Sequence, residues 1–364
     1  MDVTLRRILI FLGVTFALTW AYEFMVVWPA ATGGLGDVPA VAVQLIVAVV
    51  MFFPAIGVVV TRLVTREGFF GSSLIAPVDF RRTWKYWLLG WFGPSVLVLA
   101  GAALYFALNP ADFDPSMSHL AALLEAQAAQ TGATIAPDQV ILVGVAQLAT
   151  GILLAPALNI ATTFGEEWGW RGYLLPKLLE RRGILPTLLL SGVIWGLWHA
   201  PLTMAGHNYG MGYAGFPFAG ILAMCVFCLV TGVFMSYATL RSGSCLPAAF
   251  AHGALNGMVN AGIMFSVSGG DPFVGPAPTG ILGGAALIAC GVVMAVLLRR
   301  QEKRGGDLLL RRRPAGGEGA FAQAGESAPA GVGEHAPARD GGLPLEPAEG
   351  GEGEAFARDV KERV

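Results

Sequence analysis

Three short segments place ionisable or amide side chains inside long apolar runs of the chain. They are GEEWGWR, IWGLWHAP and FAHGALNG, which contribute Glu166, Glu167, Arg171, Trp195, His199, His252 and Asn256. An ionisable side chain at membrane depth costs on the order of a few kcal/mol to insert, and by default it marks a functional site. A carboxylate and two imidazoles can activate water for hydrolysis, so these residues are candidates for a catalytic centre.

The spacing of the first segment separates its two carboxylates. Glu167 and Arg171 are four residues apart, so they share one helix face and can form an ion pair. Glu166 is rotated from Glu167 by about 100° around the helix axis. We therefore expect Glu166 to face a cavity and Glu167 to face Arg171.

The two histidine segments repeat the four-residue spacing. His252 and Asn256 share one helix face, and Trp195 and His199 share another, so that the indole can wall the imidazole. Bringing both histidines and Glu166 to one depth requires bends, because an α-helix rises about 1.5 Å per residue. The expected places for such bends are Pro156 or Gly165 before the first motif and Pro186 or Pro201 around the second.

Two hydrolytic schemes fit these side chains if the three segments converge. Glu166, His199 and His252 match the ligand set of a catalytic zinc ion that keeps one position open for water. Without a metal, Glu166 and His199 deprotonate a water, and His252 and Asn256 donate hydrogen bonds to the oxyanion. Both schemes attack a carbonyl, and we expect a peptide bond. Both leave Asn256 the stabilising role, and the residues themselves do not decide between them.

The composition indicates a membrane protein. Hydrophobic residues make up 55% of the 364 residues and charged residues only 13%, whereas about a quarter of the residues of a soluble domain are charged. The formal net charge of −2 indicates no polyanionic partner, and we expect no binding of nucleic acid. Membrane lipid is the expected environment.

Eight apolar runs are each long enough to cross a bilayer, which takes about 20 residues. They cover about 8–28, 40–62, 86–107, 143–164, 184–205, 217–239, 246–267 and 279–298. Continuous apolar runs favour helices over the alternating pattern of barrel strands. The predicted fold is therefore all-α: a polytopic membrane protein of about eight transmembrane helices.

The loops between these runs alternate in charge. Four connections contain no Lys or Arg, namely about 29–39, 108–142, 206–216 and 268–278, while the intervening loops and the flanks of the first and last runs are basic. The positive-inside rule then predicts a multi-pass protein of the cell membrane with both termini in the cytoplasm. The basic start and long first run favour an uncleaved helix over a signal peptide.

The chain is predicted to contain one membrane domain and a tail. The membrane domain covers residues 1–300, with the motifs in a core at 140–260. Residues 301–364 form a basic flank followed, from about Pro314, by a stretch rich in Gly, Ala, Pro and Glu that we predict to be disordered. The outer loop contains one helix-forming stretch, at 118–130, which we expect to lie on the membrane interface.

The three motifs together resemble a known family. In chain order, EEWGWR fits E-E-x-x-x-R, WGLWH fits aromatic-x-x-x-H, and HGALN fits H-x-x-x-N. This arrangement resembles the CPBP intramembrane protease family, named for CAAX proteases and bacteriocin-processing enzymes and also called Abi, which contains the type II CAAX prenyl endopeptidases. The resemblance covers about residues 140–260. It implies an intramembrane endopeptidase that cleaves a membrane-associated or lipidated peptide or protein near the cytoplasmic face.

The resemblance also implies a role for each motif residue. Glu166 would activate the water with His199, and His252 with Asn256 would hold the oxyanion. The supporting residues would be Glu167, Arg171 and Trp195. The family is usually described as metal-dependent, although some members have been described as metal-free glutamate proteases, so zinc is an open expectation. Trp195 stands where Phe is commoner, and we expect this difference to have little consequence.

Two other functions fit buried polar groups in a membrane. A proton- or solute-coupled transporter also needs intramembrane acids and histidines. Against it, the chain shows no inverted repeat, and its polar groups gather in the C-terminal half. A non-catalytic immunity or scaffold protein that keeps the motifs for folding is the other alternative.

Several remaining polar or reactive side chains are expected to play no part in catalysis. Glu23 in the first run should snorkel to the outer interface or hydrogen-bond to a neighbouring helix. The histidines outside the motifs should be solvated bystanders: His119, His207 and His335. Cys225 and Cys228 should be small buried apolar residues.

Overall fold

The described part of the chain is entirely helical apart from turns and two isolated bridges. The computed structural model describes residues 2–36, 38–69, 73–76, 78–129 and 136–310. No strand occurs among them, which confirms the all-α prediction. The described residues belong to one compact unit, Met1–Arg313. The tail predicted to be disordered lies outside the described residues, as does His335.

Four of the eight predicted spans are helical segments long and apolar enough to cross a membrane. They are Val3–Ala31, Val41–Thr65, Phe80–Leu108 and Phe218–Ser242. Among the described residues the other four predicted spans correspond to shorter or interrupted helices. The long apolar segments identify the chain as a membrane protein. Apart from Phe218–Ser242, the region that carries the three motifs is built from shorter helices.

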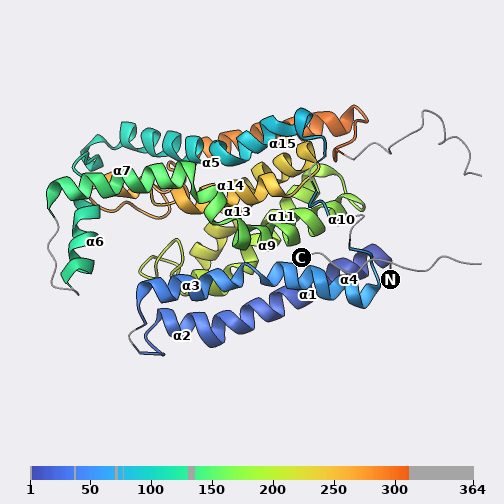
Figure 1. The fold of residues 1–364 in the computed structure, drawn as a ribbon, viewed down its shortest axis with the longest axis horizontal. Helices are drawn as coiled ribbons and strands as arrows, with labels where there is room; N and C mark the ends of the chain where they lie inside the picture. Colours follow the sequence, from blue (N-terminus) through green and yellow to red (C-terminus); the bar gives the residue numbers. More distant parts are fainter. Residues whose placement is uncertain (1, 37, 70–72, 77, 130–135, 311–364) are drawn as a thin grey trace, which may run out of the picture. The chain divides into compact units, whose positions relative to one another are not determined.

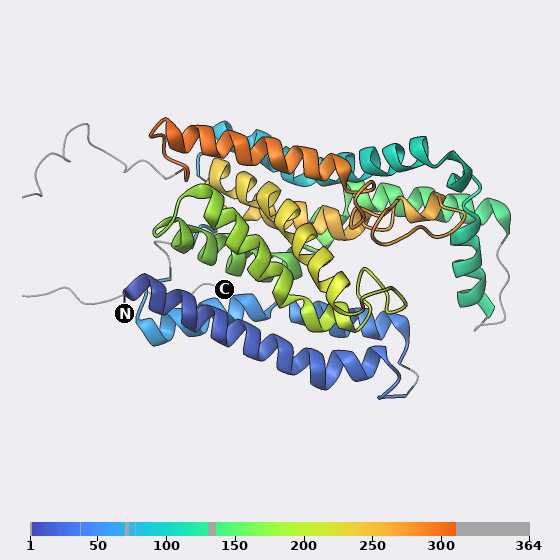
Figure 2. The ribbon, with the colours of Figure 1, turned by 180° about the vertical axis from the view of Figure 1, so that it is seen from behind.

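The first layer contains the N-terminal helices. Helix α1 (Val3–Tyr22) continues through a π-helical turn, η1 (Glu23–Val27), into α2 (Trp28–Ala31). Helices α3 (Ala40–Val50) and α4 (Phe53–Thr65) run back along it. The four helices lie on one side of the molecule, at the bottom of Figures 1 and 2.

The opposite side is built from two long helices, one from each half of the chain. Helices α5 (Phe80–Leu108) and α15 (Ala285–Lys303) lie side by side in both views. Between them and the first layer run α13 (Phe218–Ser242) and α14 (Leu246–Met258). α14 packs along α5 and also contacts α13 and α9, which places it at the centre of the bundle.

The segment with the two carboxylates is a series of short helices. Helix α7 (Pro137–Leu153) is followed by α8 (Ala155–Leu158) and α9 (Ile160–Gly169).

The series then continues through the π-helical turn η3 (Trp170–Leu174) into α10 (Leu175–Leu179). The chain bends at Leu154, just before Pro156, as predicted. Of the two alternatives, Pro156 and Gly165, the bend therefore falls near Pro156, since Gly165 lies inside α9. The missing side chain of Gly165 lets α9 approach the turn between α3 and α4, since a Cβ there would lie 3.0 Å from the carbonyl oxygen of Met51.

Helix α11 (Ile184–Trp198) packs closely along α13. A Cβ at Gly192 would lie 2.5 Å from the Cα of Leu229, and one at Gly196 would lie 2.4 Å from the Cα of Cys225. Only glycine permits this separation between the two backbones. The close approach fixes the end of α11, and therefore His199, against α13.

The outer loop contains the predicted helix. It is α6 (Ser118–Ala129), preceded by the short 3₁₀ turn η2 (Pro110–Asp112). The Asp114 carboxylate accepts hydrogen bonds from the backbone N–H groups of Ser116 and Ser118, at 2.8 and 2.7 Å. These bonds satisfy N–H groups at the start of α6, as an N-terminal cap does.

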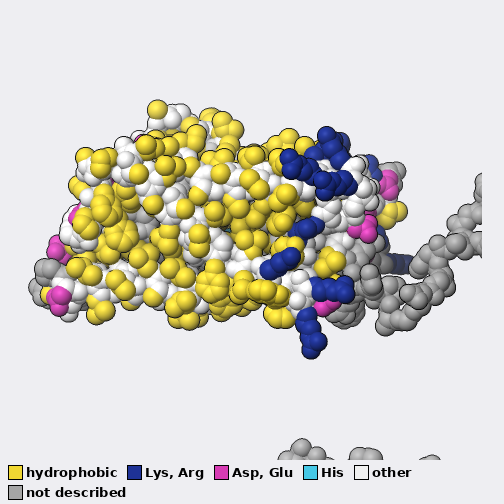
Figure 3. Space-filling model, turned by 90° about the horizontal axis from the view of Figure 1, so that it is seen from above, with side chains coloured by type: hydrophobic (Ala, Val, Ile, Leu, Met, Phe, Trp, Pro, Cys, Tyr) yellow, Lys and Arg dark blue, Asp and Glu magenta, His cyan; other side chains and the backbone are white. Residues whose placement is uncertain are grey.

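The basic side chains gather at one end of the bundle. In Figure 3 the Lys and Arg side chains lie together at that end, and the remaining surface of this face is largely hydrophobic. The loops at this end of the bundle are the ones rich in Lys and Arg. This separation is the structural counterpart of the alternating loop charge. That the basic end faces the cytoplasm stays a prediction.

Candidate active site

The three motif segments meet at one cavity of about 400 Å³. Its walls come from α3, α9, α11, α13 and α14, together with the short helix α12 (Ala200–Met204) and the loop after it. All four side chains predicted to be catalytic line it: Glu166, His199, His252 and Asn256. The helix ends and bends therefore bring these four residues together, although simple counting along the helices places them at different depths.

Glu166 is buried on α9, with 1% of its surface exposed. Its Oε1 accepts hydrogen bonds from the indole N–H groups of Trp170, at 3.3 Å, and of Trp195. Indole N–H groups can only donate, so they favour a carboxylate at this position. Among the described residues Oε2 has no hydrogen-bond partner, which leaves it available to a molecule in the cavity.

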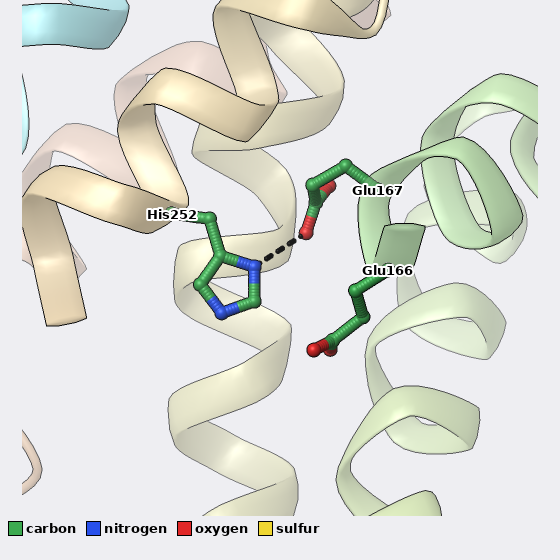
Figure 4. A group of neighbouring side chains, drawn as sticks. All are labelled: Glu166, Glu167 and His252. Atoms are coloured by element: carbon green, nitrogen blue, oxygen red, sulfur yellow. Dashed lines mark hydrogen bonds and ion pairs between the residues drawn. The ribbon is translucent and has the colours of Figure 1, made fainter. Parts of the chain in front are cut away.

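Glu167 points away from the cavity and holds two other groups of the site. Its Oε1 accepts a hydrogen bond from Nη1 of Arg171 at 2.9 Å and lies 2.9 Å from Nδ1 of His252. The predicted ion pair with Arg171 and the different direction of the two carboxylates are both confirmed. Figure 4 shows Glu167 joined to the imidazole while Glu166 extends past it.

The contact between Glu167 and His252 could not be predicted from spacing. The two residues are 85 positions apart and lie on different helices, α9 and α14. Because a carboxylate only accepts, Nδ1 of His252 carries the proton of this bond. Nε2 of His252 has no hydrogen-bond partner among the described residues. It can therefore hold a lone pair or a second proton on the cavity side.

His199 lies at the break between α11 and α12. Pro201 has no N–H to donate to the carbonyl of Leu197, which interrupts the helix here. Nδ1 of His199 lies 2.9 Å from the carbonyl oxygen of Trp195, and a carbonyl can only accept, so Nδ1 carries a proton. The neutral ring then has its lone pair on Nε2, which has no partner among the described residues. The predicted kink at Pro201 is confirmed, and it sets the position of the imidazole.

One indole joins the whole group. The ring of Trp195 lies 5.7 Å from the ring of His199, 5.5 Å from that of His252, and 4.1 Å from the guanidinium carbon of Arg171. The predicted wall for His199 is therefore confirmed. The sequence prediction overlooked the indole N–H, which donates to Glu166 and which a phenylalanine at this position would lack. The expectation that Trp195 matters little is not supported by this contact.

Two cavity residues were assigned no role by the sequence analysis. His207 was expected to be a solvated bystander, but it lines the cavity with its ring parallel to that of His199, 6.5 Å away. Cys228 is buried as predicted, yet its Sγ lies 3.7 Å from Nδ1 of His199. No local signal marks either residue, because both contacts join separate helices or loops.

Glu23 does not behave as predicted. It neither snorkels nor bonds to a neighbouring helix: only 1% of its surface is exposed, and neither carboxyl oxygen has a hydrogen-bond partner in the described part of the chain. It begins the π-helical turn η1, which packs against α3 and α12, two helices that line the cavity. The N-terminal layer thus places a third buried acid behind the cavity wall.

The arrangement does not match the predicted zinc ligands. Within the described residues, the side chains whose ligand atoms lie within 4.8 Å of one another are Glu166, Glu167 and His252, without His199. In that group the Glu167 oxygen already binds Nδ1 of His252 and the cation of Arg171. Among the described residues, Glu166, Glu167 and His252 are therefore the group that could hold a metal ion, with Nε2 of His252 free of other partners. A zinc requirement stays a prediction.

The middle of the chain matches a known protein family. Residues 146–258 match the family described as type II CAAX prenyl endopeptidase Rce1-like. This segment is similar to the CAAX proteases. It contains all three motifs, so the resemblance inferred from them is confirmed. A CAAX prenyl protease 2 of Methanococcus maripaludis is 42% identical over 52 residues, which are 14% of this chain. The match spans 19% of that relative's length.

Residues outside the matched segment 146–258 complete the cavity. Helix α3 contributes Gln44, Val47 and Val50 to its wall. Gln44 and Asn256 are exposed, and Asn159 is partly exposed, so amide groups surround the part of the cavity that is open to the outside. Amides can hydrogen-bond to a peptide backbone that would otherwise be unsatisfied in a membrane.

Proposed function

We propose that the chain is an intramembrane endopeptidase. The observation that carries this proposal is the convergence of Glu166, His199, His252 and Asn256 on one cavity inside an apolar bundle. The match of the surrounding segment to CAAX proteases supports a hydrolase of that type. Two anchored imidazoles, a carboxylate with a free oxygen and an amide are the groups that peptide hydrolysis needs.

The environments of the two histidines suggest different roles. His199 donates to a neutral carbonyl, so its ring stays neutral and Nε2 accepts a proton or hydrogen bond from water. His252 donates to the Glu167 carboxylate, which stabilises a positively charged imidazolium. The Nε2–H group of that imidazolium is then a donor for a developing negative charge.

In the proposed reaction Glu166 is the general base. Its free oxygen takes a proton from a water that His199 aligns, and the water oxygen forms a bond to the substrate carbonyl carbon. The carbonyl oxygen becomes an oxyanion, held by hydrogen bonds from His252 and Asn256. When the C–N bond breaks, the proton on Glu166 passes to the leaving amine. The products are a carboxylic acid and an amine, and the base is regenerated.

The proposed substrate is a peptide segment held at the membrane. The cavity lies between helices of a bundle that contains membrane-spanning segments, which favours a substrate that is itself held at the membrane. The relative's name specifies a prenylated CAAX substrate for that protein. For this chain we propose a membrane-associated or lipidated peptide cleaved near the cytoplasmic face, with a prenylated peptide as one member of the class.

Cleavage by purified protein in liposomes tests the proposal. The substrates are a prenylated CAAX peptide, its unprenylated form and a membrane-anchored peptide. Replacement of Glu166, His199 or His252 by alanine should slow cleavage by at least 100-fold, the usual contribution of acid–base groups. Glu125→Ala and His119→Ala, on α6 far from the cavity along the chain, serve as matched controls and should keep the rate.

Three outcomes discriminate between the candidate functions. Cleavage that persists in the three cavity variants would reject the proposed site. Proton or solute flux without cleavage in the same liposomes would favour a transporter. Loss of activity on chelation, followed by its restoration with zinc, would show that the reaction requires a metal ion.

A further inference from the structure

A second pocket, of about 530 Å³, lies between the last turns of α13 and α15. Three arginines line it together with an amide, a phenol ring and one apolar side chain: Arg241, Arg300, Arg304, Gln301, Tyr237 and Leu297. It lies at the basic end of the bundle, far along both helices from the catalytic cavity. No residue is shared between the two pockets.

The three arginines have no carboxylate partner in the part of the chain that the structure describes. The nearest acids along the chain, Glu302 and Asp307, line a different pocket, on the side of α10. Glu302 is already used there, because it pairs with Arg299 and accepts a hydrogen bond from the backbone N–H of Ile184 at 2.7 Å. The positive charge of the pocket is therefore not neutralised by these neighbours.

Arg241 is held in place before any ligand arrives. Its Nη1 donates to Oε1 of Gln301 on the facing helix, and its guanidinium carbon lies 5.8 Å from the centre of the Tyr237 ring. Within the described ranges of the chain, the other donors of its planar group have no hydrogen-bond partner, so a ligand can use them. Guanidinium groups match the geometry of phosphate oxygens, so this pocket has the chemistry of a phosphate site.

The face of α15 that leads to the pocket is apolar and exposed. Val293 and Leu297 have 57% and 45% of their surfaces exposed. Arg300 and Arg304 follow seven and eleven residues after Val293. These spacings put all four side chains on one helix face. A chain lying on this face would have hydrocarbon beside the valine and leucine and a phosphate beside the arginines.

We propose that this pocket binds the phosphate of an anionic membrane phospholipid whose acyl chain lies along α15. The apolar face distinguishes a lipid from a free phosphate ion, because only the lipid gains from contact with Val293 and Leu297. An anionic headgroup is favoured over a zwitterionic one, since a choline cation would lie next to three guanidinium groups. The site is independent of the proposed peptidase activity.

Native mass spectrometry of the full-length protein in detergent tests the site. Phosphatidylglycerol is added as the probe, with phosphatidylcholine for comparison. The wild-type protein should retain one phosphatidylglycerol and not phosphatidylcholine. The variant with Arg241→Gln, Arg300→Gln and Arg304→Gln should lose at least tenfold in affinity. Excess inorganic phosphate should leave the bound lipid in place.

The matched control removes the same charge elsewhere. Arg6→Gln, Arg66→Gln and Arg81→Gln change three exposed arginines outside the pocket, so general attraction of anionic lipid falls equally in both variants. An equal loss of affinity in the control would overturn the proposal.

Two further measurements complete the test. Displacement of the lipid by inorganic phosphate would show a free-anion site and overturn the proposal. Absence of bound phosphatidylglycerol from the wild-type protein would overturn it as well. Because Arg300 is exposed, Arg300→Gln alone should fold normally and weaken binding severalfold. An unchanged affinity in that single variant would count against the pocket even if the triple variant failed to fold.

Discussion

The indole N–H of Trp195 donates a hydrogen bond to Oε1 of Glu166 and so joins the end of α11 to α9. The same indole lies against both histidine rings and the Arg171 guanidinium. One side chain therefore sets the direction of the proposed base and walls its two imidazole partners. In this bundle, tryptophan has a role at this position that a phenylalanine can fill only in part.

Trp195→Phe should slow cleavage while leaving the fold intact. Phenylalanine keeps the ring but removes the donor, and a hydrogen bond to a charged group contributes about 1.5–3 kcal/mol. The expected loss in kcat is about 10- to 100-fold, with little change in KM. Trp84→Phe, at an exposed position on α5, is the control. Equal rates for wild type and Trp195→Phe would show that the indole N–H does not orient Glu166.

Glu167→Gln should strongly destabilise the protein. The change leaves the buried cation of Arg171 without its carboxylate and weakens the hold on His252. Removing one partner of a buried ion pair costs about 3–5 kcal/mol. The measurement is thermal unfolding in detergent of Glu167→Gln, Arg171→Gln and the double variant. The double variant should lose less stability than the two single losses added together; simple additivity would mean that the pair is not coupled.

Glu23→Met should raise the unfolding temperature. The native carboxyl group is buried, and neither oxygen has a hydrogen-bond partner among the described residues. Burial of such a polar group costs roughly 1–3 kcal/mol. Methionine has a similar length and no such requirement. Glu125→Met on α6 serves as the comparison, because that side chain is exposed. A lower unfolding temperature for Glu23→Met would indicate that the acid has a stabilising partner such as a buried water.

Acidification should loosen helix α6 before the rest of the protein. Hydrogen bonds from Ser116 and Ser118 hold the pKa of Asp114 well below its usual range. A depressed carboxyl pKa adds stability above the unfolded value of about 3.9, and that stability is lost as pH falls through the folded pKa. Hydrogen exchange of residues 118–129, corrected for intrinsic rates, should therefore accelerate below about pH 4. Asp114→Asn should remove most of this pH dependence, with α15 as the internal reference.

Contacts within one helix turn could be predicted from the sequence. The pair of Glu167 with Arg171 and the contact of the Trp195 ring with His199 follow from a spacing of four residues, because a helix repeats every 3.6 residues. The membrane class followed from composition, and the family followed from motif order. These properties depend on local chain geometry or on sums over many residues.

Only the tertiary structure decided how the separate helices combine. The bond between Glu167 and His252 joins positions 85 apart, and His207 lies at the cavity although no neighbouring residue marks it. His199, a predicted zinc ligand, stands outside the close group of Glu166, Glu167 and His252. Such relationships depend on bends, crossings and close approaches between helices, which the side-chain spacing within any one helix does not contain. The sequence by itself determined which side chains share a helix face, and the packing of the bundle decided which faces meet.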